Sequence, residues 1–78
     1  MQIPLSALKV GQFGNVVGFT DELTSLKLLE MGLLPGEHIQ LERWAPLGCP
    51  VLINLSSSQL SLRKEEADMV LVQTDNNA

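Results

Sequence analysis

Residue types that carry out chemistry are scarce in this chain. It contains one histidine, His38, and one cysteine, Cys49. Zinc and iron sites need several converging ligands, so this pair does not predict a metal centre. Cys49 has only His38 as a base, and the serines at 56–58 cluster without a triad partner, so nucleophilic catalysis is not predicted either. The simpler interpretation is that His38 is a solvated strand residue and Cys49 a small side chain in a loop.

Carboxylates and glycines do not form an active-site pattern either. Glu65, Glu66 and Asp68 lie in one charged segment where nothing would desolvate them, so we expect them to form a solvated surface. The glycines between residues 11 and 18 lack the strand-to-helix context and the Lys-Ser/Thr pair of a phosphate-binding loop. The sequence therefore predicts a protein that is not an enzyme and that has no metal site and no cofactor.

The charge balance disfavours two classes of partner. Five Lys and Arg oppose nine Asp and Glu, which gives a net charge of -4 over 78 residues. Because contact with nucleic acid or an anionic membrane depends on basic side chains, neither is an expected partner. No apolar run approaches the roughly 20 residues that cross a bilayer, and the N-terminus lacks the pattern of a secretion signal. Together with the lone cysteine, this predicts a single domain in the cytoplasm.

A helix is predicted over residues 21–31. Thr20 has the chemistry of an N-cap, and Gly32 is the residue type that ends helices in a left-handed conformation. At about 100° per residue, the apolar residues do not form one stripe, because Leu23 lies nearly opposite the central leucines and Leu26 lies at the border. We therefore expect that a single barrel surface does not cover all of them.

Short segments that alternate apolar and polar residues predict five strands. Turn formers bound them, among which Leu34-Pro35-Gly36-Glu37 predicts a type II turn. The segments at 4–11 and 64–68 predict two short helical turns. The predicted fold class is all-β with one principal helix, as a small, partly open β-barrel over residues 1–73 followed by a polar tail at 74–78. The predicted strands cover residues 14–19, 38–45, 51–55, 59–63 and 69–72.

Four large apolar residues have no evident place in the core. Leu23 and Leu26 lie on the helix, Leu47 lies in a loop bounded by proline and glycine, and Trp44 is near the end of a strand. The strand alternation points Trp44 away from the core unless a bulge intervenes. An exposed apolar patch marks a protein interface, so these four are the predicted partner-binding residues. The alternative, equally weighted, is that the N-terminal segment covers the helix and a bulge turns Trp44 inward.

The motifs of this chain resemble those of the FeoA family over nearly its whole length. The most specific matches are the helix-to-turn segment that ends in Leu34-Pro35-Gly36 and the loop Ala45-Pro46-Leu47-Gly48-Cys49-Pro50. The resemblance implies an SH3-like barrel and a bacterial, cytosolic accessory of FeoB, a membrane ferrous iron transporter with a cytosolic GTP-binding domain. FeoA proteins often carry an Asp at the position of Cys49, so a role tied to that acid is not expected here.

Two other interpretations of the resemblance stay open. The same barrel occurs as the C-terminal domain of iron-dependent repressors, which leaves a metal-responsive module as the alternative function. A GTPase-activating role would need an arginine that enters a nucleotide site, for which the chain offers Arg43 and Arg63. The expected role is docking on the cytosolic part of FeoB.

Overall fold

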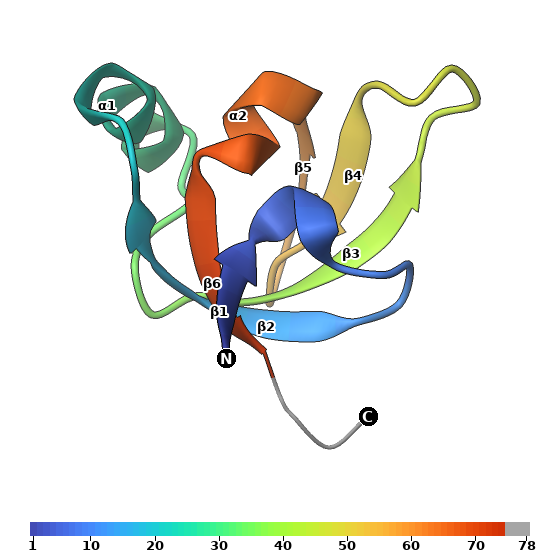
Figure 1. Cartoon of the computed structure of the whole chain (residues 1–78), viewed down its shortest axis with the longest axis horizontal. Helices are drawn as coiled ribbons and strands as arrows, with labels where there is room; N and C mark the ends of the chain where they lie inside the picture. Colours follow the sequence, from blue (N-terminus) through green and yellow to red (C-terminus); the bar gives the residue numbers. More distant parts are fainter. Residues whose placement is uncertain (75–78) are drawn as a thin grey trace.

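The structure, a computed structural model, describes residues 1–74 as one antiparallel sheet of six strands with two helices and a 3-10 turn (Figure 1). In chain order the elements are β1 (Gln2–Pro4), the 3-10 helix η1 (Leu5–Ala7), β2 (Phe13–Phe19), α1 (Glu22–Glu30), β3 (His38–Trp44), β4 (Val51–Asn54), β5 (Gln59–Leu62), α2 (Lys64–Asp68) and β6 (Val70–Thr74). The strand order is β1-β6-β2-β3-β4-β5, so β1 and β5 are the two edges of the sheet. This architecture confirms the predicted β-rich fold with one principal helix.

Aliphatic side chains fill the core. Alternate residues of each strand face it, such as Ile39 and Leu41 in β3, because successive side chains of a strand point to opposite faces. Leu5 of η1 is fully buried as well, so this turn covers part of the core. The buried hydrophobic residues are Leu5, Leu8, Val16, Leu28, Leu33, Ile39, Leu41, Val51, Ile53, Leu62, Ala67, Val70 and Val72.

β1 is a strand that the sequence does not predict. Its three residues pair with β6, and Pro4 ends it. So short a segment carries no detectable alternation, and its proline argues against a strand. β6 ends at Thr74 rather than at the predicted residue 72, and the Thr74 amide donates to the carbonyl oxygen of Met1 at 3.0 Å. The rest of the predicted tail, residues 75–78, lies outside the described residues.

The N-terminus of α1 corrects one prediction. Asp21, not Thr20, is the N-cap, and its carboxylate accepts a hydrogen bond from the Thr24 amide at 2.9 Å. That hydrogen bond also holds the pKa of Asp21 below its usual value. The Thr20 amide donates instead to the carbonyl oxygen of Met69 at 2.8 Å, just before β6. Both residue types cap helices, so only this pairing with a distant segment decides between them.

The C-terminus of α1 ends as predicted, at Gly32. Gly32 has a φ of 98°, which favours glycine, and its amide donates to the carbonyl oxygen of Leu29 at 3.1 Å. The Leu33 amide donates to the carbonyl oxygen of Leu28 at 3.0 Å, which completes a Schellman motif. Leu28 and Leu33 are both fully buried, so this motif also fixes the end of the helix onto the core.

The predicted turn and the two predicted helical segments are also present. The Glu37 amide donates to the carbonyl oxygen of Leu34 at 3.1 Å, and Gly36 between them has a φ of 92°, as a type II turn requires. η1 is shorter than the predicted segment at 4–11, whereas α2 matches its predicted range. Ala67 of α2 is fully buried, so this helix packs on the core with one side.

Candidate docking surfaces

The outer face of α1 is the first apolar surface. Leu23 is 79% exposed and Leu26 is 62% exposed, whereas Leu28 on the same helix is 0% exposed. The helix thus packs on the core with one side and presents leucines on another, as its apolar pattern predicts. Together with Glu22 and Ser25, the two leucines line a shallow cavity of about 410 Å³ along the helix. We call Leu23 and Leu26 the α1 surface.

α1 is held in place by polar contacts as well as by packing. Lys27 of α1 forms an ion pair with Glu66 of α2, and Glu66 also accepts a hydrogen bond from the Arg63 amide at 2.9 Å. The hydrogen bonds from Lys27 and from the Arg63 amide hold the pKa of Glu66 below its ordinary value. Ser6 of η1 donates to Asp68 at the other end of α2 and lowers the pKa of that carboxyl. The α1 surface is therefore carried by a fixed helix.

The loop between β3 and β4 is the second apolar surface. Leu47 is 96% exposed at its tip. The loop itself is ordered by its backbone, because the Gly48 amide donates to the carbonyl oxygen of Ala45 at 2.8 Å and the Ala45 amide donates to that of Pro50 at 2.9 Å. The peptide bond before Pro50 is cis. Leu47 is thus presented to solvent by a closed turn, as the bracketing proline and glycine predict.

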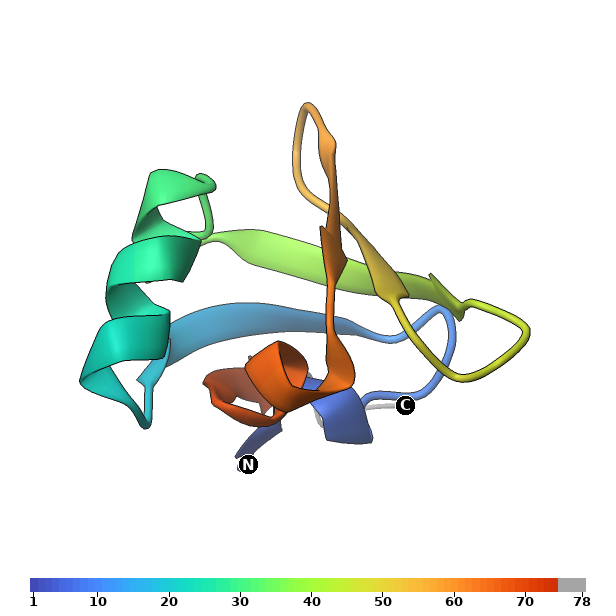
Figure 2. The ribbon, with the colours of Figure 1, turned by 90° about the horizontal axis from the view of Figure 1, so that it is seen from above.

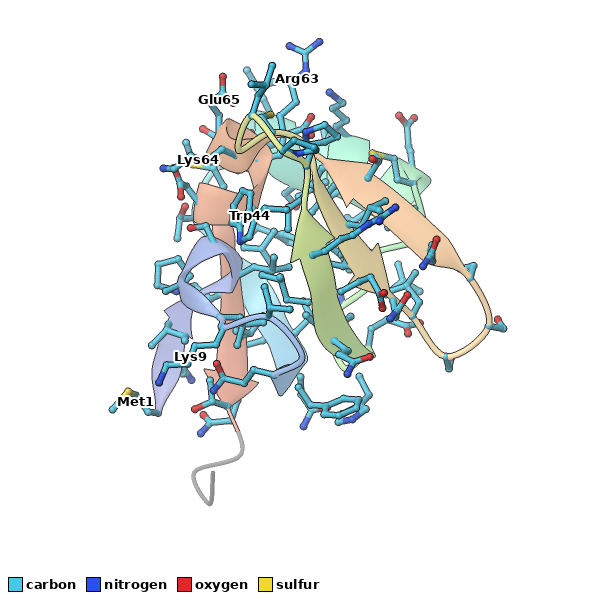
Figure 3. All side chains as sticks on the ribbon, turned by 90° about the vertical axis from the view of Figure 1, so that its right-hand side faces the viewer. Met1, Lys9, Trp44, Arg63, Lys64 and Glu65 are labelled. Atoms are coloured by element: carbon cyan, nitrogen blue, oxygen red, sulfur yellow. The ribbon has the colours of Figure 1, made fainter. Side chains whose placement is uncertain are left out.

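Trp44 is half-buried, which corrects the register expected from simple alternation. The pairing of β3 with β4 shifts between Leu41 and Arg43, so a bulge at Glu42 brings Trp44 opposite Val51. Val51 is fully buried, and Trp44 packs against the same core cluster. Of the alternative interpretation, the structure contains the bulge that turns Trp44 inward, but no N-terminal segment covers Leu23 and Leu26, which are exposed. Trp44 lies at the β3–β4 end of the molecule, the face that Figure 3 shows.

The predicted partner-binding residues do not form one continuous patch. Leu23 and Leu26 share a helix, and Leu47 and Trp44 share the β3–β4 end of the sheet. Figures 1 and 2 place α1 and the β3–β4 loop at opposite ends of the molecule. The sequence predicted the exposure of Leu23, Leu26 and Leu47, but it left that of Trp44 open and did not predict where the four lie relative to one another.

The two potential metal ligands also lie apart. His38 begins β3 and Cys49 follows its far end, so the length of the strand, roughly 20 Å for seven residues, separates them. His38 shares a hydrogen bond with Asn15 at 2.8 Å and stacks on the ring of Phe13. Within residues 1–74, no three His, Cys, Asp or Glu side chains converge as a metal site would require. These contacts match the interpretation of His38 as a surface strand residue.

A cavity on the outer face of β3, β4 and β5 was not predicted. It measures about 360 Å³ and is lined by Arg43, Trp44, Ala45, Pro46, Pro50, Leu52 and Ser61. The strand register is the feature that could have indicated this cavity, because it places Arg43 opposite Leu52 and Leu52 opposite Ser61. Such a row across three strands becomes visible only once the bulge in β3 is known, because the bulge changes which residues share a face.

Neither helix of the described residues is long and apolar enough to cross a membrane. Arg43 and Arg63, the two candidates for an arginine that enters a nucleotide site, are both exposed. Neither forms an ion pair within the described part of the chain, whose two ion pairs use Lys27 and Lys64. The described residues therefore present apolar surfaces together with two exposed guanidinium groups that form no ion pair among them.

Comparison with known proteins places this arrangement in a family. The FeoA domain model matches residues 3–74. A FeoA-like protein from Clostridium acetobutylicum is 32% identical, with a TM-score of 0.90 over 99% of this chain and 91% of that one. FeoA from Stenotrophomonas maltophilia, described as a prokaryotic SH3 domain protein and a candidate ferrous iron transport activating factor, was solved with zinc. It is 27% identical, with a TM-score of 0.74 over 94% of this chain and 89% of that one.

A more distant match concerns the fold alone. A manganese-dependent transcriptional repressor is 14% identical, with a TM-score of 0.83 over 95% of this chain and 42% of the repressor. The SH3-like barrel is thus shared with a metal-dependent repressor, as the resemblance implies. The family match over residues 3–74 and the close structural agreement with FeoA proteins lead to one conclusion: this chain belongs to the FeoA family and has its SH3-like fold.

Proposed function

We propose that this protein is a cytoplasmic accessory of ferrous iron transport that acts by docking on a protein partner, the cytosolic part of the transporter FeoB, without catalysing a reaction itself. Membership of the FeoA family supports the link to ferrous iron transport. The description of the Stenotrophomonas relative as a candidate transport activating factor is consistent with a protein partner. The observation that carries the proposal is the pair Leu23 and Leu26, exposed on a helix that is fixed at both ends.

Exposed leucines of this kind are suited to anchoring a partner. Burying a leucine side chain contributes about 1.5–3 kcal/mol, and the residues that dominate an interface each cost about 2 kcal/mol or more when truncated. Leu47 has the same character on the β3–β4 loop, where it is almost fully exposed. In the proposal, Leu23, Leu26 and Leu47 are direct anchors. Trp44 has a supporting role, because its ring packs against the core under the loop.

The test is a set of single truncations assayed for binding to the cytosolic part of FeoB and for ferrous iron uptake in cells. Leu23→Ala, Leu26→Ala and Leu47→Ala should each weaken binding about thirtyfold while the melting temperature stays that of the parent. Val10→Ala is the matched control, because Val10 is 65% exposed on a different loop. Full binding and full uptake in all three leucine variants would show that these surfaces are not the interface.

A further inference from the structure

The outer edge of β5 carries backbone amides and carbonyls that form no hydrogen bond with another strand of residues 1–74. The Leu55 amide donates to the carbonyl oxygen of Ser58 at 2.7 Å, which makes this pair a hydrogen-bonded pair of the β4–β5 hairpin. Because such pairs alternate in an antiparallel ladder, Gln59 and Ser61 direct their amides and carbonyls away from β4. Both residues are exposed, and no backbone of residues 1–74 outside the β4–β5 ladder bonds to them.

β5 lacks the features that usually protect a sheet edge. The opposite edge, β1, has three residues and ends in Pro4. β5 contains no proline and no charged residue, and its pairing with β4 shows no bulge. Proline, charge and bulges are the common means by which proteins prevent another strand from adding to an edge. β5 is therefore the edge that is open to an additional strand.

The cavity beside β5 would receive a side chain from such a strand. On the outer face, Arg43, Leu52 and Ser61 lie in one row across three strands, and Pro46 and Pro50 close the cavity at the loop. A strand added to β5 would continue this row about 4.8 Å beyond Ser61. Because the serine side chain is small, a large apolar side chain of the added strand, paired with Ser61, would reach across Ser61 and contact Leu52.

The charges around this cavity favour an acidic partner segment. Arg43 is the one charged residue among those that line the cavity. Arg63 directly follows β5 and is exposed (Figure 3). Neither guanidinium forms an ion pair with a described residue, although the whole chain carries a net charge of -4. Unpaired cations at this place attract carboxylates, and like charges on a partner would be repelled.

We propose that the free edge of β5 and the adjacent cavity form a docking site for an extended, acidic segment of a partner protein, which adds a strand to the sheet and places an apolar side chain against Leu52. Its affinity would come from the amides and carbonyls of Gln59 and Ser61, and its selectivity from the cavity and the two arginines. The proposal deepens the proposed function and depends on it only for the identity of the partner, because the site is defined by its own chemistry.

The first test uses a defined peptide rather than the transporter. The isotope-labelled full chain is titrated with the peptide Glu-Thr-Leu-Thr-Leu-Thr-Glu, with both ends blocked, and followed by amide resonances in NMR. We expect the largest shifts and slowed amide exchange at Gln59 and Ser61, and binding at least about tenfold weaker when lysines replace the two glutamates. Absence of shifts at Gln59 and Ser61 at about 1 mM peptide, or shifts confined to α1, would overturn the proposal.

Substitutions at Ser61 separate the edge from the cavity. Ser61→Pro removes the outward amide without removing a bond to β4 and should weaken the peptide about tenfold, whereas Ser61→Ala keeps the amide and should bind as the parent does. If Ser61→Pro lowers the melting temperature, Ser61→Glu serves instead, because it keeps the backbone and places a carboxylate beside the cavity to repel the acidic peptide. Parental affinity in Ser61→Glu, or in a folded Ser61→Pro, would refute the site.

The same variants distinguish this proposal from the wider one. If the cytosolic part of FeoB binds the parent and Ser61→Ala but not Ser61→Glu, the transporter uses this edge. If FeoB does not bind the parent while the peptide does, the proposed function fails and the docking site stands. If FeoB binds Ser61→Glu normally and the peptide binds nowhere near β5, the docking site fails and the proposed function stands.

Discussion

The same truncation at two positions of α1 should have very different effects on stability. Leu28 is fully buried, its carbonyl oxygen accepts the Leu33 amide, and its side chain packs in the core cluster. Leu26 lies two residues earlier and is 62% exposed. Truncation of a buried leucine to alanine costs about 2–5 kcal/mol, because the apolar contacts are lost and a cavity remains. Truncation of an exposed leucine changes the free energy of unfolding by about 0.5 kcal/mol or less.

These magnitudes are large against the stability of so small a domain. At about 0.05–0.15 kcal/mol per residue, the free energy of unfolding of 78 residues is about 4–12 kcal/mol. Leu28→Ala should therefore lower the melting temperature by about 10 °C or more, and Leu26→Ala by about 3 °C or less. Urea unfolding followed by circular dichroism measures both variants against the parent. Equal losses in the two variants would show that α1 packs with a different face, and the argument for the α1 surface would fall with it.

Three further substitutions test the fold around the two surfaces. Gly32→Ala should cost about 1–2 kcal/mol in urea unfolding because of its positive φ, whereas Gly18→Ala, where nothing lies within 4 Å of an added Cβ, should cost less. Its contacts hold the pKa of Glu66 below the ordinary 4.5, so the ionised Glu66 stabilises the fold above that pH, and this stabilisation is lost as the pH falls through the lowered pKa. Glu66→Gln should therefore reduce the loss of unfolding free energy between about pH 6 and pH 3, whereas the control Glu65→Gln should leave that loss unchanged. Trp44→Ala should lower the melting temperature by several degrees, because its ring packs on the core. An unchanged melting temperature would show that Trp44 does not contribute to the core and is available as a direct binding residue.

Local signals in the sequence predicted most of the fold. The end of α1 at Gly32 and the turn at Leu34-Pro35-Gly36-Glu37 depend on residue types within a few positions of each other, and both are present. The N-cap of α1 and the strand β1 were not predicted, and the bulge in β3 was only one of two alternatives that the sequence left open. Each is decided by pairing with a distant segment: Met69 for the cap, β6 for β1 and β4 for the bulge. Such pairings cannot be predicted from local sequence patterns, because the paired segments lie far apart in the sequence.

The candidate surfaces follow the same division. The exposure of Leu23 and Leu26 could be predicted because it depends on the angular positions of residues on one helix, and that of Leu47 because a proline and a glycine bracket it. That the α1 surface and Leu47 lie at opposite ends of the molecule could not be predicted. The cavity on the outer face was also missed, since Arg43 and Ser61 become neighbours of Leu52 only through two strand registers.

Leu23, Leu26 and Leu47, the three most exposed leucines, lie on backbone that is held by hydrogen bonds at its ends. α1 is capped by Asp21, closed by the Schellman motif at Gly32 and tied to α2 through Lys27. The β3–β4 loop is closed by its two backbone hydrogen bonds. A leucine on a fixed backbone loses little conformational freedom when a partner covers it, so more of its burial energy remains for binding. Constraint and exposure at the same positions are therefore what the proposed docking requires, because a partner that covers these leucines has little side-chain and backbone ordering left to impose.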